Sequence, residues 1–417
     1  MRTIDTLVIG AGQAGLAMSR CLAERGVDHV VLERGRVAER WRTERWDSLR
    51  LLSPNWMTRL PGWTYAGPDP HGFMTAGEVV TYLAGYATAS DAPVVEDSAV
   101  LDLGLAGDGF AVTTTDQTWH AAHVVMATGW CDQPAVPALA ATLDPAITQV
   151  VPSRYRNPRE LPDGGVLVVG ASATGAQLAN ELAAAGRRVV LAVGRHSRLP
   201  RNYRGMDIFW WLQRIGTFDR TIDELPDPVA ARREPSLQLV GRPDHRTVDL
   251  ATLRARGVEL AGRMSGIDGH RATLNADLAE TVAKADDRLR RVLGEIDRHI
   301  DATGLTAEVL DPEPQLAVAV GEPVDTIDLR DRGITSVIWA TGHRREYPWL
   351  NVPVLDEAGE IRQRFGITEC PGLYVLGQRF QHYRSSNFIE GVGRDAELVA
   401  DHLSRRAAPA APPCSSH

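Results

Sequence analysis

The hydrophobic pattern changes period twice near the beginning of the chain. Residues 6–9 form a short apolar run rich in β-branched side chains, residues 16–25 place apolar side chains at helical spacing, and residues 30–32 form a second apolar run. Gly26 follows the helical stretch, as glycine does at many helix ends. The pattern therefore predicts a strand, a helix and a second strand in succession.

Glycines occupy the turn between the first strand and this helix. The sequence GAGQAG places Gly10, Gly12 and Gly15 at the spacing G-x-G-x-x-G, and Glu33 stands at the end of the second strand. The first glycine allows a tight turn, the second lets the backbone approach a pyrophosphate, and the third lets helix and strand pack closely. The helix N-terminus presents free N–H groups to phosphates, and the acid accepts hydrogen bonds from ribose hydroxyls. The unit predicts a dinucleotide-binding turn rather than an ordinary βα turn, and its place near the start of the sequence favours FAD over NAD.

A second copy of this pattern lies in the middle of the chain. Residues 165–169 form an apolar strand, GASATG at 170–175 repeats the glycine spacing, residues 177–185 have a helical pattern that Gly186 ends, and residues 189–193 form the next strand. This internal repeat predicts a second nucleotide-binding unit and indicates that the chain has two domains.

The second unit ends differently from the first. Gly194, Arg195 and His196 follow its second strand in place of an acid, and Arg198 and Arg201 lie close by in sequence. An arginine can hold the 2′-phosphate of NADPH, whereas an acid favours the free ribose hydroxyls of NADH. The sequence therefore favours NADPH, and the alternative is that these arginines are solvated surface residues.

The remaining patterns are weaker. An arginine- and tryptophan-rich stretch at 34–46 and a proline-containing stretch at 48–63 indicate either a loop that wraps a flat ring such as a flavin or a plain hydrophobic loop. The elements predicted elsewhere are a helix at 75–87, strands of a small antiparallel insertion at 94–112 and 119–127, a helix that starts at 206 and another at 278–303, a hairpin at 324–338, a strand at 370–378, a closing helix at 387–403 and a disordered tail at 405–417.

The composition is that of an ordinary soluble protein. The chain has 417 residues, a net charge of -8, 44% apolar residues and 24% charged residues, which suits two globular domains and argues against a general nucleic-acid partner. No apolar run approaches the length of a membrane span and no basic-then-apolar leader is present, so we expect no membrane partner and a cytoplasmic location. The cysteines are far apart and the histidines are scattered, so neither a redox disulfide nor a metal site is predicted. The four cysteines are Cys21, Cys131, Cys370 and Cys414.

Several of these motifs together resemble those of the flavin-containing monooxygenases, single-component flavoproteins that use FAD and NADPH. The matching stretches are GAGQAG with Glu33, W-x-x-x-x-W-D-S-L-R-L from Trp41, G-F-M-T at 72–75, the A-T-G motifs at 127–129 and 340–342, GASATG with Arg195, and S-S-N-F-I-E-G-V-G-R-D-A at 385–396. The family's fingerprint before the second glycine motif is not retained, because Tyr155 alone matches it. Pro145, Ile147 and Val151 stand at its Phe, Gly and His positions, and Leu52 stands where the family often has Asn or His near the flavin.

The resemblance implies an α/β fold with two Rossmann-like dinucleotide-binding domains. In this arrangement an NADPH domain is inserted in a discontinuous FAD domain. The FAD domain is expected to comprise residues 1–150 and 330–417, and the NADPH domain residues 151–329, with a helical insertion at 206–319.

The resemblance also implies which residues form the site. The cofactor-binding residues are expected to be Gly10, Gly12, Gln13, Ala14, Gly15, Glu33, Arg34, Arg40, Trp41, Ala127, Thr128, Gly129, Gly377, Gly170, Ser172, Ala173, Thr174, Gly175, Arg195, His196, Arg201, Thr341 and Gly342. The polar candidates for catalysis are Asn55, Gln381, His382, Arg384 and Asn387.

The implied reaction is the transfer of one oxygen atom from a flavin hydroperoxide to a small organic substrate, with NADPH and molecular oxygen consumed. A homodimer is compatible with this assignment. Two other interpretations stay open: an NADPH-dependent flavin reductase or dehydrogenase that inserts no oxygen, and a dinucleotide-binding protein without activity. A disulfide reductase is disfavoured, because no two cysteines are close in sequence and Gly377 with Gln378 replaces that group's usual Gly-Asp.

Overall fold

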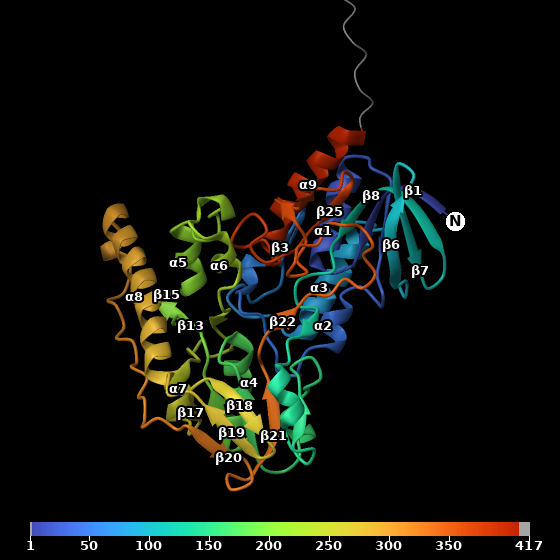
Figure 1. The fold of residues 1–417 in the computed structure, drawn as a ribbon. Helices are drawn as coiled ribbons and strands as arrows, with labels where there is room; N and C mark the ends of the chain where they lie inside the picture. Colours follow the sequence, from blue (N-terminus) through green and yellow to red (C-terminus); the bar gives the residue numbers. More distant parts are fainter. Residues whose placement is uncertain (1, 408–417) are drawn as a thin grey trace, which may run out of the picture.

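The computed structural model describes residues 2–407, and two separate β-sheets organise this part of the chain (Figure 1). The larger sheet has nine strands. Seven follow the order β23 (Gln363–Arg364), β24 (Ile367–Thr368), β25 (Leu373–Val375), β8 (Thr118–Met126), β1 (Arg2–Ile9), β2 (His29–Leu32) and β5 (Val94–Val95), while β7 (Gly109–Thr114) pairs with β8 and β6 (Val100–Ala106) pairs with β7. The second sheet has five strands in the order β10 (Thr148–Val150), β21 (Ile334–Trp339), β11 (Gly165–Val169), β12 (Val189–Ala192) and β17 (Glu259–Ala261). Every strand pair from β25 to β5, and every pair in the second sheet, is parallel.

The helices cover these sheets and fill the space beside them. They are α1 (Gln13–Glu24), α2 (Glu39–Thr43), α3 (Ala76–Ala89), α4 (Ala173–Ala184), α5 (Ile208–Arg214), α6 (Pro228–Arg232), α7 (Leu250–Ala255), α8 (Leu278–Thr303) and α9 (Val392–Ala407). Short 3-10 turns occupy Asn55–Met57, Ala138–Thr142, Pro158–Glu160, Ile222–Glu224 and Leu305–Ala307. The remaining short strands are β3 (Arg59–Leu60), β4 (Trp63–Thr64), β9 (Gln133–Pro134), β13 (Ser197–Arg198), β14 (Asn202–Tyr203), β15 (Met206–Asp207), β16 (Leu237–Gln238), β18 (Met264–Asp268), β19 (Arg271–Leu274), β20 (Thr326–Asp328) and β22 (His343–Arg344).

The central strands are buried on both faces, because other elements cover each side of the sheets. Every residue of β2, β11 and β12 is buried, as expected for parallel strands in an α/β protein. In the larger sheet α1 packs against α9, and α3 extends the same apolar layer. In the second sheet α4 and α7 cover one face, and the small sheet β18-β19-β20 packs on the other. We call the larger sheet with its helices the first lobe, and the five-stranded sheet with its helices the second lobe.

The chain crosses between the lobes twice, and the two crossings lie side by side. β9 and β22 pair antiparallel, with Pro134 opposite His343. Beside this pair, the hydroxyl of Thr341 donates a hydrogen bond of 2.7 Å to the carbonyl oxygen of Ala135. The first lobe is therefore built from both ends of the chain, and the second lobe from its middle.

The two strand–turn–helix–strand units and the helix at 278–303 are confirmed by the structure. Four other predictions are wrong in part. The strand predicted at 119–127 does pair antiparallel with β7, but it is also a central strand of the larger sheet, parallel to β1 and β25. Its last four residues are buried, which a strand confined to a small insertion does not require. No hairpin forms at 324–338, because β20 pairs with β19 while β21 enters the second sheet.

The other two corrections concern the ends of the predicted segments. The region 206–319 is not purely helical, since β17 completes the second sheet beside β12. The closing helix begins at Val392 and continues to Ala407, so residues 405–407 of the predicted tail are helical. Residues 408–417, which hold the rest of that tail and Cys414, lie outside the described residues.

Candidate dinucleotide-binding sites

A cavity of about 560 Å³ opens at the carboxyl ends of the parallel strands in the first lobe. It lies at the N-terminus of α1, which is where doubly wound sheets bind nucleotides. The predicted residues that line it are Gly10, Gly12, Gln13, Ala14, Glu33, Arg34, Arg40, Trp41, Ala127, Thr128, Gly129, Gly377 and Asn387. The structure thus brings together residues that are far apart in sequence.

The glycine turn of the first lobe has the shape that an anionic group requires. Gly10 has a φ of 106°, and a Cβ atom there would lie 2.8 Å from the carbonyl oxygen of Ala127. A Cβ on Gly15 would lie 1.7 Å from the carbonyl oxygen of Gly10, so this glycine does not line the cavity but lets α1 pack against the turn. Gly12 faces open space and no side chain caps the first turn of α1. The free N–H groups there are a ready site for phosphate.

Glu33 fixes the same turn from the end of β2. Its Oε2 accepts a hydrogen bond of 2.7 Å from the backbone N–H of Ala11, and its Oε1 accepts one of 3.2 Å from the N–H of Gly35. The side chain is buried at the wall of the cavity. Each carboxylate oxygen has a further lone pair, so the group can also accept hydrogen bonds from a ribose.

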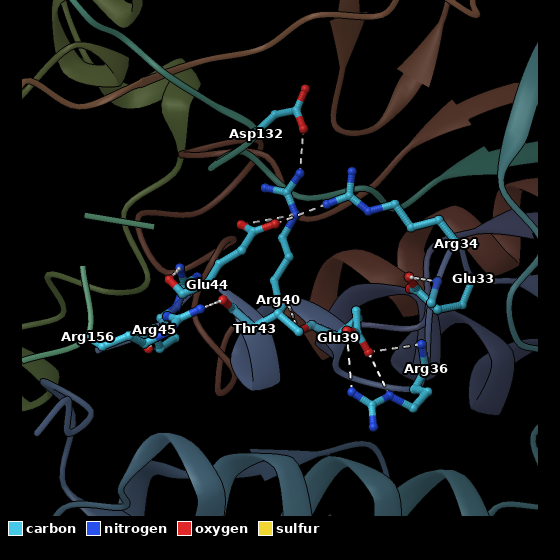
Figure 2. A network of polar contacts seen from close by, with 11 residues as sticks. Glu33, Arg34, Arg36, Glu39, Arg40, Thr43, Glu44, Arg45, Asp132 and Arg156 are labelled. Carbon is cyan, nitrogen blue, oxygen red and sulfur yellow. Dashed lines mark hydrogen bonds and ion pairs between the residues drawn. The ribbon is translucent and has the colours of Figure 1, made fainter. Parts of the chain in front are cut away.

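The arginine-rich segment beside this cavity is held by paired charges (Figure 2). Arg40 forms an ion pair with Asp132, Arg34 lies 3.2 Å from Glu44, and Arg36 lies 3.0 Å from Glu39. Arg156 reaches from the second lobe to the carbonyl oxygens of Thr43 and Arg45. These contacts order α2, so that Trp41 lies at the cavity wall.

A second cavity, of about 840 Å³, lies at the N-terminus of α4. The predicted residues that line it are Gly170, Ser172, Ala173, Thr174, Arg195, Thr341 and Gly342. Gly170 has a φ of 104°, and a Cβ atom there would lie 2.4 Å from the carbonyl oxygen of Ala340. Gly175 packs against Gly170 as Gly15 packs against Gly10. Ser172 occupies the middle glycine position, and no side chain caps α4.

The structure separates the arginines that follow the second unit. Arg195 is exposed and lines the cavity, where its Nη2 donates a hydrogen bond of 3.0 Å to the carbonyl oxygen of Arg233. Arg198 is buried and paired with Asp249 at 2.8 Å and with Asp286 at 2.7 Å.

Arg201 and His196 do not line this cavity, which corrects the grouping expected from their place in the sequence. Arg201 is 1% exposed, pairs with Asp207 and donates a hydrogen bond of 2.7 Å to the carbonyl oxygen of Leu52. His196 is fully buried, with its Nδ1 3.0 Å from the carbonyl oxygen of Gly194. Both side chains belong to the interior because the chain turns inward directly after Arg195.

Of the polar candidates for catalysis, Asn387 alone lines one of the two cavities. The amide of Asn55 donates to the carbonyl oxygen of Asp69 and accepts from the N–H of Met74, each at 2.9 Å, so this side chain holds a loop. Gln381 is fully buried, with its Oε1 3.3 Å from the N–H of Gln378.

The other two candidates lie at the contact between the lobes. The ring of His382 lies between those of Phe365 and Tyr383, with centroids 4.0 Å away on each side. Arg384 pairs with Glu234 of the second lobe at 2.7 Å. These positions indicate structural contacts for Asn55, Gln381, His382 and Arg384.

The two cavities meet at Trp130 and Cys131, which line both. These residues follow the first A-T-G motif, and their position was not predicted from the sequence. The pattern also missed Arg232, Arg233 and Arg379 of the second cavity. None of these arginines belongs to a nucleotide motif, and only the folding of distant segments brings them to the cavity.

Two further features of residues 2–407 bear on the chemistry. No helix between residues 2 and 407 is long and apolar enough to cross a membrane. Over the same range, no three His, Cys, Asp or Glu side chains gather in a way that could hold a metal ion. Cys21, Cys131 and Cys370 are free thiols in that range.

Comparison with known proteins agrees with this geometry. The profile of the family described as pyridine nucleotide-disulphide oxidoreductase matches residues 7–212. A flavin-containing monooxygenase from Stenotrophomonas maltophilia superposes with a TM-score of 0.68 at 19% identity, over 98% of this chain and 100% of that one. The probable indole-3-pyruvate monooxygenase YUCCA1 of Arabidopsis thaliana is 30% identical over 209 residues, which are 49% of this chain and 50% of that protein.

The fold is thus the mixed α/β fold of the FAD- and NAD(P)-binding flavoprotein oxidoreductases. Relatives that match nearly the whole chain include an uncharacterized CzcO-like oxidoreductase of Geobacillus kaustophilus, which is 31% identical over 403 residues, or 96% of this chain and 98% of the relative. The chain belongs to the family of the CzcO-like oxidoreductases.

Proposed function

We propose that this protein is an FAD- and NADPH-dependent monooxygenase that oxygenates a small organic substrate. The observation that carries the proposal is that the two cavities meet at Trp130 and Cys131. Each cavity lies at an uncapped helix N-terminus beside a glycine turn. Such an arrangement lets one dinucleotide pass electrons to another without a carrier between them. The monooxygenase named among the superposed structures and the one named among the sequence relatives support oxygen insertion as the outcome.

In this proposal FAD occupies the first cavity. The N–H groups of α1 and the open face of Gly12 suit its pyrophosphate, and Glu33 suits a ribose. FAD supplies the redox chemistry and the activation of oxygen when bound. The chain's own residues hold it and enclose it, and residues 1–150 with 330–417 form its domain.

NADPH is assigned to the second cavity, in a domain of residues 151–329. The N-terminus of α4 suits its pyrophosphate, and Arg195 suits the 2′-phosphate. The stretch 232–236 also lines this cavity, so the region 206–319 takes part in the nucleotide site and is not only a cover for the substrate.

The test combines three measurements on the purified protein. We expect about one FAD per chain, anaerobic bleaching of the flavin by NADPH in preference to NADH, and, with a turned-over substrate, one labelled oxygen atom in the product when the gas is ¹⁸O₂. Flavin bleaching with hydrogen peroxide as the sole oxygen product across a panel of amines, sulfides and ketones would instead favour a reductase that inserts no oxygen. A protein that purifies without flavin and takes none up would contradict both.

A further inference from the structure

Arg379 is an unpaired cation at the wall of the second cavity, although it belongs to the first lobe. It follows Gly377 and Gln378 after β25, and its guanidinium carbon lies 5.3 Å from the centroid of the Trp130 ring. Within residues 2–407 its side chain makes no ion pair and no hydrogen bond. Burial, and then the charge of Arg384, lower the pKa of Arg379 to about 10. The guanidinium therefore stays charged at neutral pH, and a partly buried charge without a partner is costly.

The other arginines around this cavity differ from Arg379. Those of the first lobe have acidic partners: the pairs are Arg344 with Glu346 at 2.8 Å, Arg345 with Glu360, and Arg362 with Glu369 at 3.0 Å. Arg233 of the second lobe is exposed, so water can solvate it. Arg232 has no acidic partner in residues 2–407 either, but its Nε donates a hydrogen bond of 3.4 Å to the carbonyl oxygen of Phe380, whereas the side chain of Arg379 has no such acceptor. Glu234, an acid of the same cavity whose charge acts on Arg379, is already paired with Arg384 at 2.7 Å. Arg379 thus faces the cavity without any anion assigned to it.

A short stretch of the second lobe brings Arg379 close to Arg195. Arg195 donates to the carbonyl oxygen of Arg233 at 3.0 Å, while the preceding Arg232 donates through its Nε to the carbonyl oxygen of Phe380 at 3.4 Å. Phe380 is the residue next to Arg379 in the chain. Arg195 and Arg379 therefore lie on either side of the two-residue stretch 232–233, from opposite lobes, and the positive charge of Arg195 acts on Arg379. Two like charges placed together without a counterion indicate a site for a strong anion.

We infer that Arg379 and Arg195 clamp the same anionic group, the 2′-phosphate of NADPH, from the two lobes. The inference rests on the proposed assignment of NADPH to the second cavity and adds a specificity residue that no nucleotide motif contains. A phosphate carries close to two charges at neutral pH and offers several acceptor oxygens, so two guanidinium groups can bind it at once. NADH has no such group and leaves both arginines unpaired.

The test measures nucleotide binding without turnover. Isothermal titration calorimetry of the FAD-loaded protein is carried out with 2′,5′-ADP, which carries the 2′-phosphate, and with 5′-AMP, which lacks it. We expect Arg379→Gln and Arg195→Ala each to weaken 2′,5′-ADP binding about tenfold or more and to leave 5′-AMP binding unchanged. Arg379→Lys should retain part of the affinity. The double variant should lose less than the sum of the two single losses, because both arginines contact one group.

Arg362→Gln is the matched control, since Arg362 lines the same cavity from the first lobe but is paired with Glu369. It should bind 2′,5′-ADP like the wild type. Unchanged 2′,5′-ADP binding by a folded, flavin-loaded Arg379→Gln would overturn the clamp, and so would an equal loss of 5′-AMP binding, which would place Arg379 on the 5′-phosphate.

The outcomes separate this inference from the proposed function. Failure of the wild type to bind 2′,5′-ADP would overturn the NADPH assignment together with the clamp. Binding of 2′,5′-ADP through both arginines in a protein that inserts no oxygen would refute the monooxygenase and leave the clamp standing.

Discussion

The carboxylate of Asp395 lies 3.8 Å from Nδ1 of His382, and the Asp395 side chain is fully buried on α9 whereas that of His382, in the loop before this helix, is 11% exposed. Burial raises the pKa of Asp395 to about 7 and lowers that of His382. The nearby charges are Arg394 on the same helix and Asp223, which acts on His382 from the second lobe. Between pH 3.8, the ordinary pKa of the group, and about pH 7, the native protein therefore keeps a proton on Asp395 that the unfolded chain has released.

This shift predicts a pH-dependent gain of stability in Asp395→Asn. A raised acid pKa in the folded state stabilises the protein most below the unfolded value, and the contribution is lost as the pH rises to about 7. The amide cannot ionise, so the free energy of unfolding of the variant should exceed that of the wild type by a few kcal/mol at pH 8, on the order of 1.4 kcal/mol per pKa unit. At pH 4 the difference should be small. Thermal melts between pH 4 and 8 measure the difference. Glu397→Gln, at an exposed position of the same helix, is the control, and a difference independent of pH would contradict the assignment.

Glu33→Ala should release FAD. The carboxylate is expected to accept hydrogen bonds from the ribose of FAD. Loss of a charged acceptor weakens binding by about 1.5–3 kcal/mol. Retention of FAD should therefore fall about 10- to 100-fold, as measured by fluorescence of flavin released on dilution. Part of the effect comes from the turn, since the N–H of Ala11 loses its acceptor. Glu33→Gln keeps an acceptor and should lose less, whereas wild-type retention in Glu33→Ala would mean that the acid contacts no ribose.

Arg195→Ala should weaken NADPH and hardly affect NADH. Loss of the guanidinium should raise the apparent dissociation constant for NADPH about tenfold or more. The rate of flavin reduction at saturation should stay the same, because the 2′-phosphate lies far from the hydride. Stopped-flow reduction under anaerobic conditions measures both quantities. Arg256→Ala, at an exposed position just after α7, should match the wild type. Equal constants for NADH and NADPH in the wild type would refute the assignment.

Arg198→Met should unfold the protein more easily without changing its choice of nucleotide. Arg198 is buried with Asp249 and Asp286, and Asp249 also accepts from the N–H of Thr252 at the start of α7. Removing one partner of a buried pair leaves an unpaired charge and costs about 3–5 kcal/mol. Urea unfolding should show this loss, and Arg256→Met should not. A large rise in the NADPH constant with normal stability would mean that Arg198, rather than Arg195, contacts the phosphate.

The sequence was most informative where the signal is local. The glycine turns with their flanking strands, and the helix at 278–303 with its regular apolar stripe, depend on residues close together in the chain, and both were predicted correctly. The arginines after β12 were predicted as a group because they are neighbours in sequence. Whether each one turns inward or outward depends on Asp207, Asp249 and Asp286, which no local pattern relates to them.

The hydrophobic pattern along the chain could not predict the contacts between the lobes. Arg379 and Arg232 lie well over a hundred positions apart, yet both line the second cavity. Their meeting follows from the pairing of β8 with β25, which brings the last part of the chain into the first sheet. A prediction that had placed β8 in the centre of that sheet, rather than in an antiparallel insertion, would have brought residues 377–379 to the nucleotide sites.

The pairing of β9 with β22 also bears on how such a chain could be taken apart. Pro134 and His343 stand opposite one another in an antiparallel pair, where Cα atoms are about 5 Å apart. The segment between these two residues contains all five strands of the second sheet, and it starts and ends at this one strand pair. A peptide of a few residues could therefore close the gap if the middle of the gene were excised, and another module with adjacent ends could be grafted in its place. The ends of the first sheet would not need to move to accept it.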